Sequence, residues 1–191
     1  MRRGIIIVIT FLIIMQSMAF AEASHDKLQQ DSAAIMVRLG LLKGYNNGDL
    51  GLERNITRAE FATIIIRMMG YDTNPFNVGK EIAFKDLSKK HWAYSSVRMA
   101  ASLGYIKGYF DKTFKPSRNI TYAEAAAIMV RILKYDSNLE GKWPDNYLNK
   151  AKEIGITKNL DIVPKKAITR GDVSILVVDS LPVDLGEPEK K

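Results

Sequence analysis

The chain has 191 residues, of which 47% are hydrophobic and 26% charged, and its formal net charge is +7 at pH 7. This length suits one compact domain or a few small repeats that share a core. The sequence has no cysteine, which excludes a disulfide framework, a thiol nucleophile and a lipid-anchored cysteine. The two histidines, His25 and His91, lie far apart in sequence, so we expect neither a histidine-based metal site nor a cofactor.

Residues 1–21 have the pattern of a secretory signal peptide. A positive start at Arg2 and Arg3 precedes an apolar stretch over 5–15, and small residues occupy the first and third positions before Glu22. The apolar stretch is shorter than the roughly 20 residues that span a bilayer. We therefore expect export and cleavage, with an uncleaved membrane anchor as the alternative.

The expected cleavage removes two arginines and no acidic residue, so the net charge falls from +7 to +5. A mildly basic exported chain suits an anionic polymer as its partner. Nucleic acid is the general alternative for a basic chain. Because an exported chain rarely meets nucleic acid and the lysines are scattered, we expect no nucleic-acid partner. No later segment is apolar enough to span a membrane, so no membrane contact is expected after signal cleavage.

Internal repetition dominates the rest of the sequence. Residues 39–72 align without a gap to residues 103–136, and about half of the paired positions are identical. A weaker third copy begins at Gly155, with the same order of features and a shorter loop. The polar, proline-containing end of the chain is predicted to be disordered. The predicted boundaries are 22–72, 73–138 and 139–183 for the three repeats and 184–191 for the disordered tail.

Each repeat is predicted to consist of a helix, a glycine-rich loop and a second helix. In the second copy, apolar residues from Trp92 to Leu103 recur at three- and four-residue steps, which predicts one apolar helix face. Gly104 then ends the helix, because glycine readily adopts the left-handed conformation beyond a helix C-terminus. The loop 105–111 turns the chain, and Pro116 extends it toward the next helix.

A capping signal introduces the second helix of every repeat. Thr57 is expected to cap the first turn while Glu60 returns the hydrogen bond. The same capping box recurs at Thr121 and, with an aspartate in place of the glutamate, at Thr169. Strongly apolar helices follow at 62–69, 125–133 and 173–181. Such helices are too apolar to face water on most sides, so we predict an all-α fold in which they meet as a central three-helix bundle.

The second copy carries the motifs of a known family. They are the opening Phe84-Lys85-Asp86, the pair Trp92-Ala93, the loop Gly104-Tyr105-Ile106-Lys107-Gly108-Tyr109, the approach Phe114-Lys115-Pro116 and the cap Ile120-Thr121-x-Ala123-Glu124. With them the chain resembles the S-layer homology (SLH) domain, usually found as three tandem copies, over roughly residues 28–183. The resemblance implies a pseudo-threefold arrangement of three helix-loop-helix repeats.

The three copies also depart from the family pattern. The first lacks the Phe-x-Asp and Trp opening and begins near Leu28. The third has Trp143-Pro144-Asp145 in place of Phe-x-Asp, is predicted to have no aromatic that matches Trp92, and has the short loop. The second has Tyr122 where the other two caps carry arginine. The number of working sites is therefore left open.

The resemblance implies noncovalent attachment to a secondary cell-wall polymer, often carrying a pyruvylated amino sugar, in grooves between neighbouring repeats. Arg58 and Arg170 lie at first helical turns, where unpaired N–H groups and the helix dipole favour an anion. A guanidinium also matches a carboxylate with two hydrogen bonds, and a tryptophan can stack on a sugar ring. The candidate polymer-binding residues are Arg58, Arg170, Trp92, Gly44, Gly108, Lys43 and Lys107.

Each candidate has another interpretation. The arginines can be solvated first-turn residues, and an aromatic at helical spacing, such as Trp92, more often belongs to the core. The glycines can serve the turns alone, and matched lysines also keep repeats soluble. If neighbouring repeats build a groove, we expect a site that combines Arg58 with Trp92 and Gly108.

The sequence is compatible with more than one function. The leading one is binding of an anionic wall polysaccharide at the cell wall or S-layer of a bacterium. The alternative is a structural adaptor whose degenerate repeats bind other envelope proteins, suggested by Tyr122 and the short third loop. A wall hydrolase needs a positioned carboxylate pair or a nucleophile with its base. Glu60 and Glu124 are assigned to capping and no Gly-x-Ser-x-Gly or His-Glu-x-x-His string occurs, so we expect no catalytic residues and no enzyme.

Overall fold

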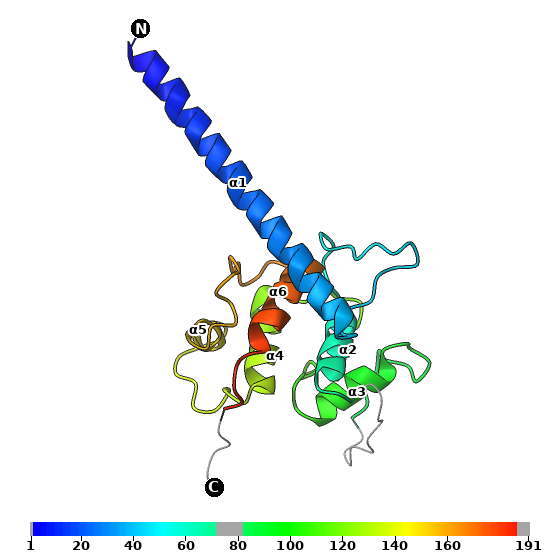
Figure 1. Cartoon of the computed structure of the whole chain (residues 1–191). Helices are drawn as coiled ribbons and strands as arrows, with labels where there is room; N and C mark the ends of the chain where they lie inside the picture. The colour runs from blue at the N-terminus through cyan, green and yellow to red at the C-terminus, as the bar shows by residue number, and fades with distance from the viewer. Residues whose placement is uncertain (1, 72–81, 187–191) are drawn as a thin grey trace.

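The computed structural model describes residues 2–71 and 82–186, and these residues form six helices and no strand or sheet. The helices are α1 (Arg2–Arg38), α2 (Arg58–Met68), α3 (Tyr94–Ser102), α4 (Tyr122–Ile132), α5 (Asp145–Glu153) and α6 (Arg170–Ser180) (Figure 1). The predicted all-α class is confirmed. Each predicted repeat contributes two helices, α1 and α2, α3 and α4, and α5 and α6.

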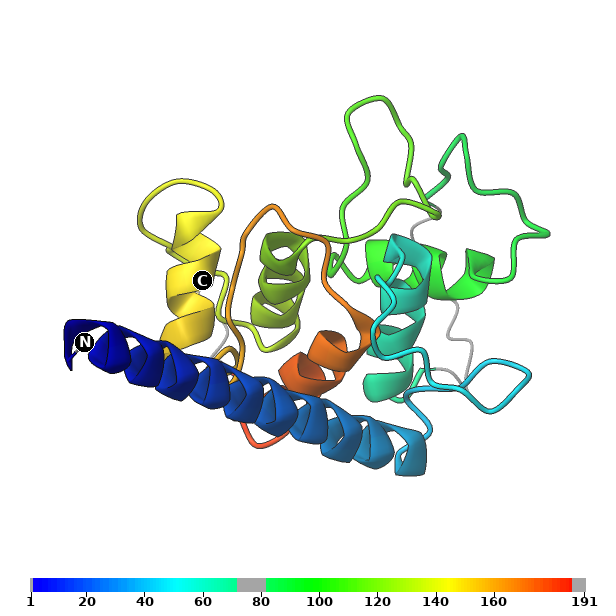
Figure 2. The same ribbon diagram turned by 90° about the horizontal axis from the view of Figure 1, so that it is seen from above.

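The helices pack across the repeat boundaries. Helix α3 packs on α2, α5 packs on α4, and α1 packs on α6. The first helix of each repeat therefore lies against the second helix of the preceding repeat, and α1 completes the circle by lying on the last helix. Figures 1 and 2 both show α1 running across α6 and extending well beyond it. The first and last repeats are thus joined directly.

Helices α2, α4 and α6 supply most of the core. Nine of the 11 residues of α4 are buried, whereas α5 buries only Ala151. The largest fully buried side chains on the three inner helices include Phe61, Ile65, Met129 and Leu176. Burying them removes apolar surface from water, which is the main favourable term in folding. The helices that the sequence marks as most apolar are therefore the buried ones.

A ring of backbone hydrogen bonds joins the segments that precede these three helices. The N–H of Ile56 donates to the carbonyl of Ile168 at 3.1 Å, that of Ile120 donates to Ile56 at 3.1 Å, and that of Ile168 donates to Ile120 at 3.0 Å. Each segment donates to one neighbour and accepts from the other. All three isoleucine side chains are fully buried. These bonds link the three segments in a closed ring, while the pseudo-threefold arrangement that the family resemblance implies stays a prediction.

The predicted caps are present at the start of the inner helices. Thr57 with Glu60 and Thr121 with Glu124 form complete capping boxes. Thr169 caps α6 by accepting a hydrogen bond from the backbone N–H of Asp172 at 3.1 Å, but the aspartate side chain does not return it. The shorter carboxylate points elsewhere, to partners described below.

The two ends of the chain bear on other predictions. Helix α1 is continuous across the expected cleavage point, and the signal peptide stays a prediction. Among the described residues, none of the helices combines the length and the apolar character needed to cross a membrane. The N–H of Gly186 donates to the carbonyl of Leu133 at 2.8 Å, which holds the start of the predicted disordered tail against the end of α4. Residues 187–191 of that tail lie outside the described residues.

Replacing Ile120 by alanine tests the importance of the ring. The side chain is fully buried at the ring, so we expect the free energy of unfolding to fall by about 2–5 kcal/mol in urea denaturation. Ile35→Ala makes the same chemical change at a side chain that is 38% exposed, and its effect should stay within about 0.5 kcal/mol. Equal losses in the two variants would contradict this account.

Candidate functional site

Two pockets lie at equivalent places between the repeats. The first has a volume of about 180 Å³, and its wall includes Lys43, Glu60, Arg67, Trp92 and Arg170. All three repeats contribute to it. The loop and α2 of the first repeat supply the first three of these residues, the second repeat supplies the tryptophan, and the third repeat supplies the last arginine.

The second pocket has a volume of about 240 Å³, and its wall includes Lys107, Glu124, Arg131, Trp143 and Arg58. Each of these residues corresponds to a residue of the first pocket, moved on by one repeat. The second repeat provides the lysine, the glutamate and Arg131, the third provides the tryptophan, and the first provides Arg58. The pockets are therefore two copies of one composite site.

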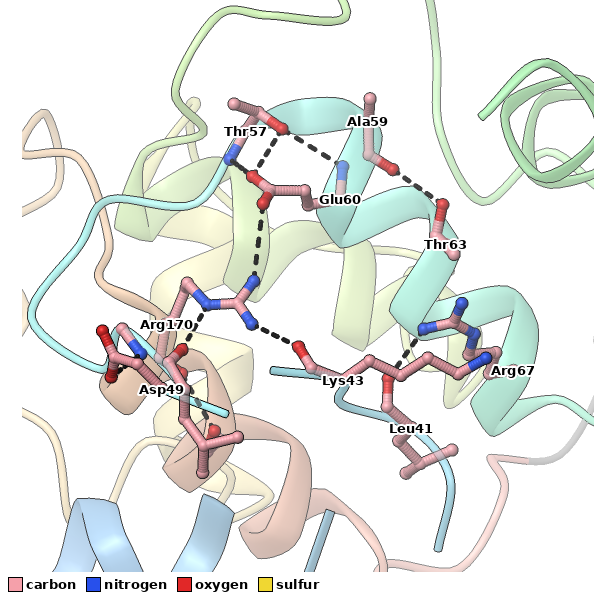
Figure 3. Close-up of polar contacts among 12 residues, drawn as sticks. Leu41, Lys43, Asp49, Thr57, Ala59, Glu60, Thr63, Arg67 and Arg170 are labelled. Atoms are coloured by element: carbon pink, nitrogen blue, oxygen red, sulfur yellow. Dashed lines mark hydrogen bonds and ion pairs between the residues drawn. The ribbon is translucent and has the colours of Figure 1, made fainter. Parts of the chain in front are cut away.

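Arg170 reaches from the start of α6 into the loop of the first repeat (Figure 3). Its Nε donates to the carbonyl of Leu50 at 2.8 Å and its Nη2 donates to the carbonyl of Lys43 at 2.8 Å. Its Nη1 lies 3.4 Å from a carboxylate oxygen of Glu60. The guanidinium also lies 5.1 Å from the centre of the Tyr45 ring. Only 5% of this side chain is exposed, so its donors are used mainly within the protein.

Arg58 makes the matching contacts in the second pocket. Its Nε donates to the carbonyl of Phe114 at 2.9 Å and its Nη2 donates to that of Lys107 at 3.1 Å. Its Nη1 lies 3.8 Å from Glu124, and its guanidinium lies 5.0 Å from the centre of the Tyr109 ring. Burial lowers the pKa of Arg58, and the tyrosine and the glutamate partly offset that effect. An arginine remains protonated in such surroundings.

The expectation of unpaired N–H groups at the first turns is wrong. The backbone N–H of Arg58 donates to the carbonyl of Arg118 at 2.9 Å, and that of Arg170 donates to Arg54 at 2.8 Å. The interpretation of both arginines as solvated residues is also wrong, because both are 4% exposed. The cause lies in the fold. The approach segment of a neighbouring repeat supplies the carbonyls, and a helix start seen alone in sequence does not reveal them.

Each pocket carries more positive than negative charge. Three cationic side chains and one glutamate line the first pocket, and the second repeats this balance. Arg67 and Arg131, in the last turns of α2 and α4, complete the two sets and were not among the predicted site residues. They occupy paired positions in the aligned segments 39–72 and 103–136, so the repeat alignment contained the signal. Such a balance favours an anionic ligand.

An exposed tryptophan borders each pocket. Trp92 is 65% exposed and lies just before α3, so its assignment to the core is wrong. Trp143 is 53% exposed, lies just before α5, and contacts Tyr147 edge to face at 5.8 Å. The prediction that the third repeat has no counterpart of Trp92 is therefore also wrong. Position relative to the helix start, rather than the adjacent Pro-Asp, identifies Trp143 as that counterpart.

The loop glycines serve packing within the chain. A Cβ on Gly44 would lie 3.0 Å from the carbonyl oxygen of Asp49. A Cβ on Gly108 would collide with the ring of Phe84 and lie 2.9 Å from the carbonyl oxygen of Thr113. Position 108 thus needs glycine for the loop itself, whereas a side chain at position 44 requires the neighbouring backbone to shift slightly. Lys43 and Lys107 are exposed and line the pockets, while their carbonyls hold the buried arginines.

The structure separates the expected combination of Arg58, Trp92 and Gly108. Trp92 lines the pocket that contains Arg170, whereas Arg58 lines the pocket that contains Trp143. The reason is the helix pairing described above. Since α3 packs on α2, its preceding tryptophan lies beside the loop of the first repeat rather than beside the loop of its own repeat.

The third junction differs from the other two. Tyr122 takes the place of the arginine, and its hydroxyl donates to the carboxylate of Asp172. His25 and Gln29, on α1, each place a side-chain nitrogen 2.9 Å from the other carboxylate oxygen. Burial alone would raise the pKa of Asp172, but these hydrogen bonds outweigh it and the pKa lies below its ordinary value. Burial and the neighbouring carboxylate raise the pKa of Tyr122.

Comparisons with known proteins agree with these features. Residues 23–62 and 83–126 match the S-layer homology domain. The middle cell wall protein of Brevibacillus brevis is 35% identical over 170 residues, which are 87% of this chain and 16% of that protein. The surface layer protein of Brevibacillus choshinensis is 35% identical over 136 residues, 71% of this chain and 12% of that protein.

A third relative is the cellulosome-anchoring protein of Acetivibrio thermocellus. It is 30% identical over 176 residues, which are 84% of this chain and 39% of that protein. The chain therefore spans only a minor part of the length of each of these three relatives. Residues 139–183, the third predicted repeat, lie outside both segments that match the domain family.

Replacing Arg58 by alanine tests the role of the buried guanidinium. The change removes one of the two arginines that pair with Glu124 and leaves two loop carbonyls without a donor, so we expect a loss of about 1–3 kcal/mol in the free energy of unfolding. Arg38→Ala, at an exposed arginine in the last turn of α1, is the matched control and should change it by less than about 0.5 kcal/mol. If Arg58→Ala leaves the free energy of unfolding unchanged, the loop keeps its place without the guanidinium.

The pH dependence of unfolding tests the Asp172 cluster. Because its folded pKa lies below the ordinary value of about 3.9, Asp172 stabilises the fold above that pH, and this contribution is lost as the pH falls through the folded pKa. We expect Asp172→Asn to be destabilised at pH 7 and the gap from the unsubstituted protein to shrink below about pH 4. Asp26→Asn, at an exposed position on α1, should show little gap at any pH. A constant gap for Asp172→Asn would rule out the assigned charge effect.

Proposed function

Because this chain belongs to the S-layer homology family, we propose that it attaches noncovalently to the bacterial cell wall by binding an anionic wall polysaccharide in its two pockets. The family is a cell-wall anchoring domain, and the relatives named above are wall, surface-layer and anchoring proteins. The main support is the repetition of one arrangement in both pockets: an exposed tryptophan beside an excess of cationic side chains.

The cationic side chains divide into two roles. Arg58 and Arg170 direct their donors to loop carbonyls and a glutamate, so they act as positioning residues that hold the pocket in shape. Lys43 and Lys107 extend from those same loops with exposed side chains. Together with the arginines in the last turns of α2 and α4, these lysines are the groups we assign to direct contact with a carboxylate.

The shape and chemistry of the pockets suit the polymer class that the family resemblance implies. A pyruvylated amino sugar offers a carboxylate to the cations and a ring face to Trp92 or Trp143. The volumes of about 180 and 240 Å³ are below the roughly 300–1,000 Å³ of pockets that enclose a drug-sized ligand. We therefore assign one sugar residue, or the end of a polymer chain, to each pocket.

The competing functions have less support. An adaptor made of degenerate repeats is expected to have filled junctions, whereas two junctions here have open pockets and one is filled. A glycoside hydrolase uses two carboxylates flanking the bond. Each pocket has one, Glu60 or Glu124, and each is engaged by its helix cap and by an arginine. We therefore assign binding and no catalysis.

Replacement of both tryptophans tests the proposal. We expect the unsubstituted protein to sediment with native wall sacculi and the Trp92→Ala/Trp143→Ala variant to bind at least about tenfold more weakly, equivalent to about 1.4 kcal/mol. Phe110 is fully exposed and lines neither pocket, so Phe110→Ala is the matched control and should bind normally.

Sacculi stripped of their secondary polymers supply the second control for this experiment. The unsubstituted protein should remain in the supernatant with them. Equal retention on stripped and native sacculi would exclude the polymer as the ligand. Unchanged retention of the double variant, with its fold verified by circular dichroism, would exclude the two pockets as the binding sites.

A further inference from the structure

One junction combines three residue changes relative to the other two. At the first helical position, Tyr122 replaces the arginines of α2 and α6. At the third position of the facing helix, Asp172 replaces the glutamates of α2 and α4. The second position of that helix is Gly171, where α2 and α4 have alanine. The sequence shows these changes separately, and the structure brings them together.

The N-terminal helix fills the space that these changes create. A Cβ on Gly171 would lie 2.5 Å from the amide of Gln29, so the side chain of Gln29 occupies the place of the missing methyl group. That amide donates to Asp172 at 2.9 Å and lies 3.2 Å from the imidazole of His25. At the other two junctions the first helix of a repeat starts just after an exposed tryptophan, whereas α1 runs on as a helix across this junction.

The polar groups at this junction are satisfied inside the protein. One carboxylate oxygen of Asp172 accepts from Tyr122 and the other lies within hydrogen-bond distance of Gln29 and His25. Its side chain is 8% exposed, compared with 25% for Glu60 and 23% for Glu124 in the two pockets. A neutral tyrosine has also replaced the buried cation. The junction therefore lacks the buried cation of the two pockets, and Gln29 fills the space beside Gly171. The loop lysine that matches Lys43 and Lys107 in the third repeat is Lys158, and it pairs with Asp179 at 3.8 Å.

We propose that this junction, formed by His25, Gln29, Tyr122, Gly171 and Asp172, is a closed clasp that holds α1 on α6, and that the chain consequently presents two anion sites rather than three. The number of sites rests on the function proposed above, whereas the clasp does not. Two sites on one rigid body also give bivalent attachment. When both can engage, avidity exceeds the affinity of either site by about 10²–10⁴-fold.

Calorimetric titration with the methyl glycoside of a pyruvylated N-acetylhexosamine measures the number of sites. We expect two equivalents for the unsubstituted protein, one for Trp92→Ala or Trp143→Ala, and two for Gln29→Ala. Three equivalents for the unsubstituted protein would overturn the inference. So would the loss of an equivalent in Gln29→Ala, because a clasp residue makes no ligand contact.

Hydrogen exchange of the α1 amides at 22–38 tests the clasp without a ligand. Gln29→Ala should raise their exchange rate at least tenfold, whereas Gln30→Ala, at the exposed neighbouring glutamine, should leave it unchanged. Gly171→Ala should raise it as well, because the new methyl group displaces Gln29. Adding Gln29→Ala to Gly171→Ala should then restore much of the protection, a coupling expected only for residues in contact.

The two measurements separate the possible failures. If no glycoside binds but exchange follows this pattern, the proposed ligand is wrong and the clasp stands. If two equivalents bind but Gln29→Ala and Gln30→Ala exchange alike, the clasp is wrong and the proposed function stands.

Discussion

The three-way backbone ring at Ile56, Ile120 and Ile168 is the constraint on which the rest of the molecule depends. Each of these residues immediately precedes a helix cap, so the ring places the start of each inner helix against the approach segment of a neighbouring repeat. Buried backbone groups must find partners, and here those partners lie in another repeat. The ring therefore helps to determine where the first side chains of α2 and α6 point, which is into the loop of a neighbouring repeat.

The two pockets are a direct consequence of that geometry. A buried guanidinium is costly unless its donors are used and its charge is countered. Arg58 and Arg170 meet both needs through two loop carbonyls and one glutamate, so the arginine orders the loop and the loop shelters the arginine. What remains available to a ligand is the outer layer of exposed lysine and tryptophan, together with the arginines in the last turns of α2 and α4. Each site thus has a buried arginine that supports the loop and an outer layer of side chains that can contact a ligand. Because these residues come from different repeats, each site is made from all three.

The third junction shows how the same scaffold reaches a different result. Tyr122 and Asp172 preserve a polar contact at the corresponding place but exchange an ion pair for a hydrogen bond from a neutral hydroxyl. The glycine beside the aspartate then lets α1 approach closely. Seen in the sequence alone, these three departures from the family pattern suggest a degenerate repeat. In the structure they are mutually compatible, because the junction that lacks the buried cation is also the one on which α1 packs.

The sequence by itself determined the features that depend on neighbours within a few residues: the capping boxes at Thr57 and Thr121, the helix end at Gly104 and the apolar inner helices. These arise from local hydrogen bonds and helical periodicity, which a single segment contains. Only the tertiary structure decided that Trp92 accompanies Arg170, that Trp143 accompanies Arg58, and that the first-turn N–H groups are paired. The first two outcomes require each first helix to pack on the preceding repeat, and the third requires the approach segment of a neighbouring repeat to supply the carbonyls. No local sequence pattern contains this information, because it depends on contacts between residues far apart in the chain.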